Sequence, residues 1–135
     1  MFNKLVKVTG LAGILCVSNL YAGCICEGFQ VKIKNNLQDD IEVTQLMIEG
    51  GQFDPHGTPI ISKKSEGAFT LTQVRPGPML ATVAVESKST PKKAFEIKFT
   101  LEDKNVVCIH DHISQVGNVN IDKTRKIGEV VYTID

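Results

Sequence analysis

The sequence predicts an all-β protein: an antiparallel β-sandwich of about eight or nine short strands after an N-terminal signal peptide. Three observations support this fold class. Apolar and polar residues alternate with a period of two through most of residues 29–134, which is typical of half-buried strands. Clusters of Gly, Pro, Asn and Asp interrupt this alternation at the spacing expected for a sandwich. After residue 22, no segment shows sustained helical periodicity.

The first 22 residues are interpreted as a secretory signal, which leaves a single domain over residues 23–135. Lys4 and Lys7 precede an apolar run at residues 8–17 that is too short to span a bilayer, and the small residue Ala22 follows it. A general signal peptidase would cut after Ala22. Tyr21-Ala22-Gly23-Cys24 also resembles the bacterial lipobox, although Tyr21 stands where an aliphatic residue is preferred. We therefore expect a periplasmic or secreted protein, with an outer-membrane lipoprotein acylated at Cys24 as the alternative.

Residues 23–88 are expected to contain four strands and one long loop. The apolar residues that mark these strands are Phe29, Val31 and Ile33; Ile41, Val43, Leu46 and Ile48; Ile60 and Ile61; and Phe69 and Leu71. The phase of the second strand changes near Gln45, which predicts a bulge there. A loop is expected from Gly50 to Pro59, and Arg75-Pro76-Gly77-Pro78 is a rigid break that a central strand could not contain.

The second half shows the clearest alternation in the chain. Its expected strands are marked by Met79, Ala81, Val83 and Val85; by Phe95, Ile97, Phe99 and Leu101; and by residues 106–113, 119–121 and 130–134. Turns are expected at residues 87–93 and 103–105 because small and polar residues gather there.

The charge of the chain argues against nucleic-acid binding. The full sequence has 15 basic and 15 acidic residues, so loss of Lys4 and Lys7 leaves a net charge near −2. Three short basic groups are assigned to turns and interpreted as solvated charge: Lys63-Lys64, Lys92-Lys93 and Lys123-Arg125-Lys126. No second apolar stretch is long enough to span a membrane.

Three cysteines remain once Cys16 leaves with the signal. In an oxidising compartment they predict one disulfide between Cys26 and Cys108, with Cys24 as the alternative partner. A metal site is the competing interpretation, because His110 and His112 would share one strand face with Cys108. Together with Cys24 and Cys26 these residues could ligate Zn²⁺ or Cu⁺. No other cofactor is expected.

Candidate ligand-binding residues lie in two loops. Asp54 and His56 belong to the loop at residues 50–59, and Arg75 belongs to the Pro-Gly loop at residues 75–78. Loops on a rigid sandwich often carry function, although turn-forming Pro and Gly explain these loops more simply. No Gly-x-Ser-x-Gly elbow is present and no pair of carboxylates is placed across a plausible cleft, so we do not expect an enzyme.

The order of turn residues carries a resemblance. Val31-Lys32-Ile33-Lys34-Asn35-Asn36, Gly50-Gly51, Pro59-Ile60-Ile61, Phe69 and Gly77 follow one another in an order similar to the N-terminal halves of actinoporin-like and aegerolysin-like sandwiches. The chain is also similar to small exported β-proteins of Gram-negative bacteria. The resemblance implies a sandwich that binds lipid head groups or glycans at loop tips. It assigns no site residue, because Trp and an amphipathic N-terminal helix are missing.

The sequence thus leads to the expectation of an exported, non-enzymatic binding or interaction protein. Its partner would be a protein, a glycan or a lipid head group. A periplasmic metal-binding protein and a lipid-anchored envelope protein are the alternatives.

Overall fold

The structure is a computed structural model that describes residues 24–88, 91–104 and 106–135. The predicted signal peptide and both predicted cleavage sites lie outside the described residues. Within them the fold is all-β and contains no helix. The ten strands are β2 (Gln30–Asn35), β3 (Ile41–Ile48), β4 (Gly51–Asp54), β5 (Ile60–Ile61), β6 (Glu66–Gln73), β7 (Met79–Ser87), β8 (Ala94–Lys104), β9 (Val107–Gly117), β10 (Ile121–Lys126) and β11 (Glu129–Ile134).

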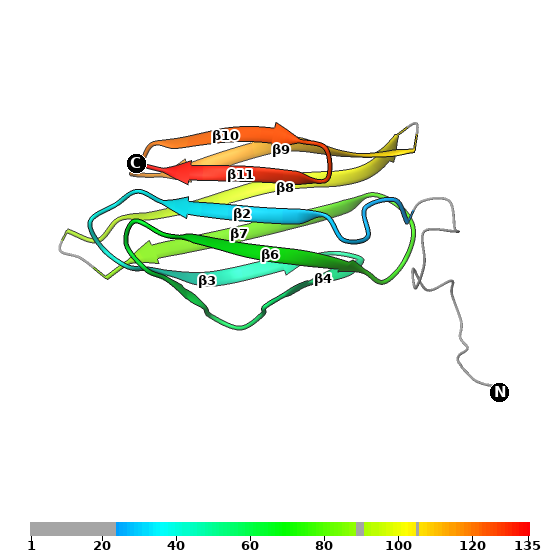
Figure 1. The fold of residues 1–135 in the computed structure, drawn as a ribbon. Helices are drawn as coiled ribbons and strands as arrows, with labels where there is room; N and C mark the ends of the chain where they lie inside the picture. Colours follow the sequence, from blue (N-terminus) through cyan, green and yellow to red (C-terminus); the bar gives the residue numbers. More distant parts are fainter. Residues whose placement is uncertain (1–23, 89–90, 105) are drawn as a thin grey trace.

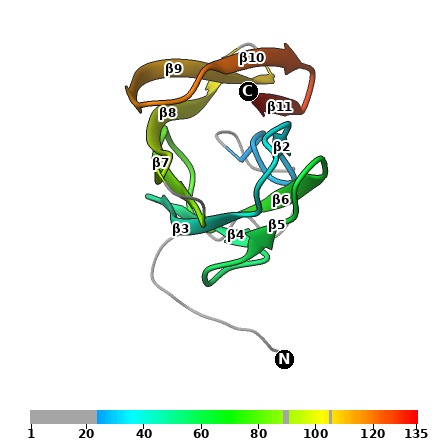
Figure 2. The same cartoon turned by 90° about the vertical axis from the view of Figure 1, so that its left-hand side faces the viewer.

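The strands form two sheets that pack face to face, which confirms the predicted sandwich (Figure 1). One sheet has the order β10-β11-β2-β6-β4 and the other has the order β5-β3-β7-β8-β9. Neighbouring strands pair antiparallel, except that β11 lies parallel to β2. The view along the strands shows the two sheets curving toward each other, with β9 and β10 side by side where one sheet ends and the other begins (Figure 2).

The core lies between the sheets and is filled by the residues that alternate in the sequence. Every apolar residue predicted to face inward on β7 and β8 is buried. The largest fully buried side chains include Phe53, Phe69 and Tyr132 from one sheet and Phe99 from the other. Period-two burial of this kind is what an antiparallel sheet with one wet face requires.

Two bulges adjust the second sheet. The pairing of β3 with β7 shifts between Val43 and Gln45, which confirms the predicted bulge. A second shift occurs where β8 passes from Lys98 to Phe99, and it leaves Ile113 of β9 as the extra residue. The inward-facing positions of β9 before this bulge are Cys108, His110 and His112, because they lie opposite inward-facing residues of β8.

The expected loop at residues 50–59 is wrong in its first part, because residues Gly51–Asp54 form strand β4. Phe53 is buried, and β4 pairs antiparallel with β6. A Cβ at Gly51 would lie 2.9 Å from the carbonyl oxygen of Thr72. The glycine therefore allows a close approach of two strands rather than a turn.

The assignment of Lys123, Arg125 and Lys126 to a turn is also wrong, because all three belong to β10. The strand expected at residues 119–121 begins only at Ile121. β10 pairs with β11 along its whole length, yet it is an edge strand with little buried surface. An edge strand of this kind needs no apolar alternation, so the sequence pattern did not reveal it.

The turn between β2 and β3 is closed by a buried amide. Asn35 is fully buried, and its side chain accepts a hydrogen bond from the backbone N–H of Leu37 at 3.0 Å. Its amide nitrogen donates to three backbone carbonyls, those of Asp39 at 2.9 Å, Ile61 at 3.2 Å and Ser62 at 3.2 Å. A buried polar side chain satisfied in this way fixes the turn against the β5 segment.

Candidate functional site

The candidate site is a hollow of about 410 Å³ between strand β9 and the β10–β11 hairpin. We call it the seam groove, because β9 and β10 are the edges of different sheets and do not pair with each other. It is lined by Phe29, Val107, Cys108, Ile109, His110, Arg125, Lys126, Ile127 and Glu129. Most of these side chains are apolar, and two of them are cationic.

A disulfide fixes one wall of the seam groove. Cys26 and Cys108 are bonded to each other across 82 residues of sequence, which confirms the predicted pairing. Cys26 is buried, and Cys108 belongs to the groove lining. No cysteine among the described residues is free. The disulfide ties the segment before β2 to β9, so it holds the N-terminal segment against the groove.

A buried histidine–tyrosine pair lies behind the disulfide. His110 is 4% exposed, and its Nε2 atom lies 2.6 Å from the hydroxyl oxygen of Tyr132. Its ring also packs on Phe99, with 4.8 Å between ring centroids. Burial, together with the neighbouring charges of Lys123 and Arg125, lowers the pKa of His110 to about 4. The imidazole is therefore neutral at ordinary pH.

The second ring nitrogen of this histidine has no hydrogen-bond partner in the described part of the chain. The same is true of the Nδ1 atom of His112, the next inward-facing residue of β9. Burial lowers the pKa of His112 as well, and the nearby Lys123 adds to this effect. Burial raises the pKa of Tyr132, so its hydroxyl keeps its proton. The inner wall of β9 thus presents neutral, incompletely hydrogen-bonded rings.

Two exposed cations of β10, Lys123 and Arg125, lie on the same face of the strand, and Arg125 also lines the groove. Lys123 lies opposite Tyr132, and Arg125 lies opposite Val130. Both partners on β11 are buried, so both cations lie on the side of the strand that faces the interior of the sandwich. The Nη1 atom of Arg125 donates a hydrogen bond of 2.9 Å to the carbonyl oxygen of His110. The side chain of Arg125 therefore spans the gap that no backbone pairing closes.

The five residues of the predicted metal site lie on two elements, the segment before β2 and strand β9. Cys26 and Cys108 bond to each other and so offer no thiolate in this form. His110 and His112 do share one face of β9 with Cys108, as predicted. Within residues 24–88, 91–104 and 106–135, no group of three or more His, Cys, Asp or Glu side chains is arranged to hold a metal ion.

The predicted ligand loops do not gather into one site. His56 and Asp54 are 70% and 81% exposed, with 3.9 Å between His56 Nδ1 and Asp54 Oδ1. Arg75 lies at the far end of β4, where its backbone N–H donates to the carbonyl of Gly50 at 3.3 Å. The pairing of β4 with β6 places Asp54 three residues away from this end. Arg75 is thus at a different position along the strand from His56.

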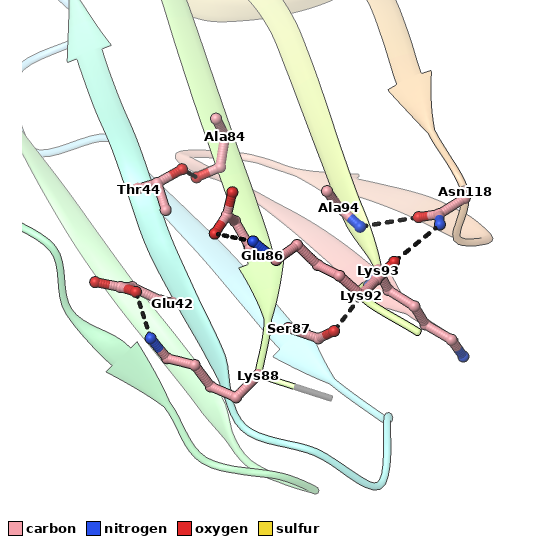
Figure 3. Close-up of polar contacts among 10 residues, drawn as sticks. All are labelled: Glu42, Thr44, Ala84, Glu86, Ser87, Lys88, Lys92, Lys93, Ala94 and Asn118. Carbon is pink, nitrogen blue, oxygen red and sulfur yellow. Dashed lines mark hydrogen bonds and ion pairs between the residues drawn. The ribbon is translucent and has the colours of Figure 1, made fainter. Parts of the chain in front are cut away.

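A second, shallower hollow of about 290 Å³ lies on the outer face of the other sheet, beside Ala84 and Val116. Figure 3 shows the polar contacts around it, which include Lys88 with Glu42 at 2.6 Å and Lys92 with Glu86 at 3.3 Å. Lys88 and Lys92 are each matched by a carboxylate. These contacts hold the end of the β7–β8 connection to the sheet, and exposed ion pairs of this kind contribute little to stability.

Arg125 in the groove lining, and Lys123 and Tyr132 close to it, were not among the predicted site residues. The same is true of the other lining residues apart from Cys108 and His110: Phe29, Val107, Ile109, Lys126, Ile127 and Glu129. The signal that could have found the two cations is their spacing, because residues two apart on a strand share a face. Because the sequence analysis assigned these residues to a turn, it did not place them on a shared strand face. Tyr132 was expected in the last strand, but nothing in the sequence pairs it with His110.

No family model and no curated protein matches this chain. A search of the described residues for a helix long and apolar enough to cross a membrane finds none.

Proposed function

We propose that this chain is an exported, non-enzymatic binding protein whose ligand site is the seam groove. The observation that carries the proposal is the combination of an apolar hollow, two cations and a disulfide at one place. The disulfide fits export, because such bonds persist in oxidising compartments. A concave, mostly apolar site with a few polar groups is the usual form of a ligand pocket.

The charges of the groove favour an anionic ligand. Its one carboxylate, Glu129, forms an ion pair of 3.3 Å with Lys32. Arg125 and Lys126 form no ion pair among the described residues. A ligand that carries a negative charge beside an apolar portion would therefore match the groove.

The cations of the groove support binding of an anionic head group more than binding of a neutral glycan, the two loop-tip ligands that the sequence led us to expect. The exposed large apolar side chains of the described residues include no aromatic ring, so a neutral glycan would find no stacking surface. An anionic head group or an acidic segment fits the cations better. Asp54 and His56 offer no comparable enclosure, because both side chains are mostly exposed.

The groove is tested with anilinonaphthalene sulfonate, an anionic probe that fluoresces in apolar surroundings. We expect saturable binding to the folded protein, and we expect Arg125→Ala to weaken it about tenfold, the effect of losing one charge-assisted hydrogen bond. Lys98→Ala is the matched control, because Lys98 is an exposed cation on the outer side of β8. Equal affinities of wild type and Arg125→Ala would contradict a site in the seam groove.

Export is tested separately by the intact mass of the mature protein from its host. A chain that starts at Gly23 supports a soluble exported protein. A chain that starts at Cys24 with added acyl mass supports the lipid-anchored alternative. A full-length mass that still includes residues 1–22 contradicts export by a cleaved signal.

A further inference from the structure

The stretch of β9 from Val107 to His112 is a sheet edge with less protection than the other edges have. Exposed strand edges attract other chains, and proteins usually blunt them by shortness, charge or bulges. The edge strands β4 and β5 are short, with four and two residues. Where β5 does not cover β3, β3 forms the edge, and it contains a bulge. β10 carries the cations Lys123, Arg125 and Lys126. β9 has 11 residues, and Asp111 is its only residue of the Asp, Glu, Lys and Arg types. Its bulge at Ile113 lies beyond the stretch from Val107 to His112.

The register of β9 shows which of its backbone groups point away from β8. Lys104 pairs with Val107 at the hairpin end, so the pairing alternates from there along the strand. Under this alternation, the N–H and C=O groups of Cys108, His110 and His112 point away from β8. The bond from Arg125 to the carbonyl of His110 is consistent with that direction. In the described part of the chain, these three residues make no backbone hydrogen bond on this side.

We propose that the edge of β9 at Cys108, His110 and His112 binds an extended acidic peptide segment of a partner protein by strand addition. This rests on the proposed function and names the ligand of the same groove. The peptide would replace the side chain of Arg125 at the carbonyl of His110 and would form main-chain hydrogen bonds with β9. A lipid head group has no row of backbone amides, so it cannot form these main-chain hydrogen bonds with β9.

The side chains on the two sides of the added strand define its pattern. Its inward-facing residues would lie beside Lys123 and Arg125 and would be acidic. Its outward-facing residues would lie beside Val107 and Ile109 and would be aliphatic. The segment that fits is therefore an alternation of acidic and aliphatic residues, a pattern with period two.

The test uses the mature protein and a labelled peptide of alternating Glu and Val. Three comparison ligands separate the sources of binding: the same peptide with N-methylated amides, an alternating Lys-Val peptide, and phosphatidylglycerol vesicles. Affinity is measured by fluorescence anisotropy, and vesicle binding by co-sedimentation. Amide hydrogen exchange is measured at His110 and His112, whose N–H groups are free on the proposed edge.

We expect the Glu-Val peptide to bind at least tenfold more tightly than its N-methylated form and the Lys-Val peptide, and to slow exchange at both amides. In the double variant Lys123→Glu/Arg125→Glu, the preference should change to the Lys-Val peptide, while Lys98→Glu should leave it unchanged. Equal binding of the methylated peptide, unchanged exchange, binding of the vesicles alone, or no binding would each overturn strand addition. Failure of the peptides alongside retained, Arg125-dependent probe binding would overturn this inference while the proposed function stands.

Because the double variant also removes the bond from Arg125 to His110, its fold is checked by thermal unfolding. If it unfolds, the wild-type comparison of plain and methylated peptides still decides the question, since it changes only the ligand.

Discussion

Removing the disulfide should reduce the stability of the domain by an amount that the sequence separation sets. Cys26 and Cys108 close a loop with a separation of 82 residues. The chain-entropy relation for a loop of this size gives a loss of about 4.5 kcal/mol at 25 °C. A single domain of this size typically has a free energy of unfolding of about 5–15 kcal/mol, so the loss is a large share of the total. We therefore expect Cys26→Ala/Cys108→Ala to remain folded only in mild conditions.

The assay is urea unfolding of wild type and of the double variant, with near-ultraviolet circular dichroism as the probe. Both proteins should have similar m-values if the native surface is unchanged. Wild type in reductant serves as the internal comparison, because it loses the bond without changing the side chains. A loss below about 1 kcal/mol would refute the reasoning, since the cross-link would then restrict the unfolded chain far less than its loop length requires.

Three further perturbations test other parts of the structure. The pKa of His110 is about 4 in the folded protein against 6.5 in the unfolded chain, so the unfolded state binds a proton first as pH falls. The contribution of neutral His110 to the free energy of unfolding is therefore fully present above pH 6.5, and it should fall by about 3 kcal/mol on acidification to pH 4. Urea titrations across this range measure the loss. His56→Gln changes an exposed histidine and should show the same dependence of the unfolding free energy on pH. Tyr132→Phe leaves the buried Nε2 of His110 without its partner and should cost about 1–3 kcal/mol in urea unfolding, and a variant as stable as wild type would show that the pair contributes nothing. Val106 has a φ of 59° at an exposed hairpin end, a conformation that a β-branched residue adopts only with strain. Val106→Asn should therefore stabilise the protein by about 1 kcal/mol and raise the thermal midpoint by a few degrees. An unchanged or lower midpoint would contradict that strain.

The sequence predicted the core of this fold because its strands obey period-two burial. The inward residues of β7 and β8, the first strand from Phe29 onward and the bulge near Gln45 all follow from which face must be apolar. The disulfide followed from cysteine number and compartment. These features depend on local patterning and on simple counting, and both are visible without coordinates.

Other features depend on which segments meet in space. Gly51 reads as a turn residue in one dimension, but in the sandwich it allows β4 to approach β6 closely. The pairing of β2 with β11 is parallel and joins the two ends of the described chain, and no local pattern announces it. The contact of His110 with Tyr132 likewise joins β9 and β11, which belong to different sheets, so it depends on how the two sheets pack together.

The seam groove escaped prediction for a related reason that bears on its role. Lys123 and Arg125 occupy inward-facing positions of β10, where a buried strand would carry apolar residues. Inward-pointing cations are one way to protect a free edge from association, and this alone could explain them. Edge protection, however, would apply equally to β9, which has the longer free edge and only one charged residue. In the proposed strand addition, the cations of β10 beside the edge of β9 would discourage basic or apolar strands there and attract acidic ones. Protection of the β10 edge and selection of an acidic ligand for the β9 edge would then be the same electrostatic effect. The variant Lys123→Glu/Arg125→Glu tests both together.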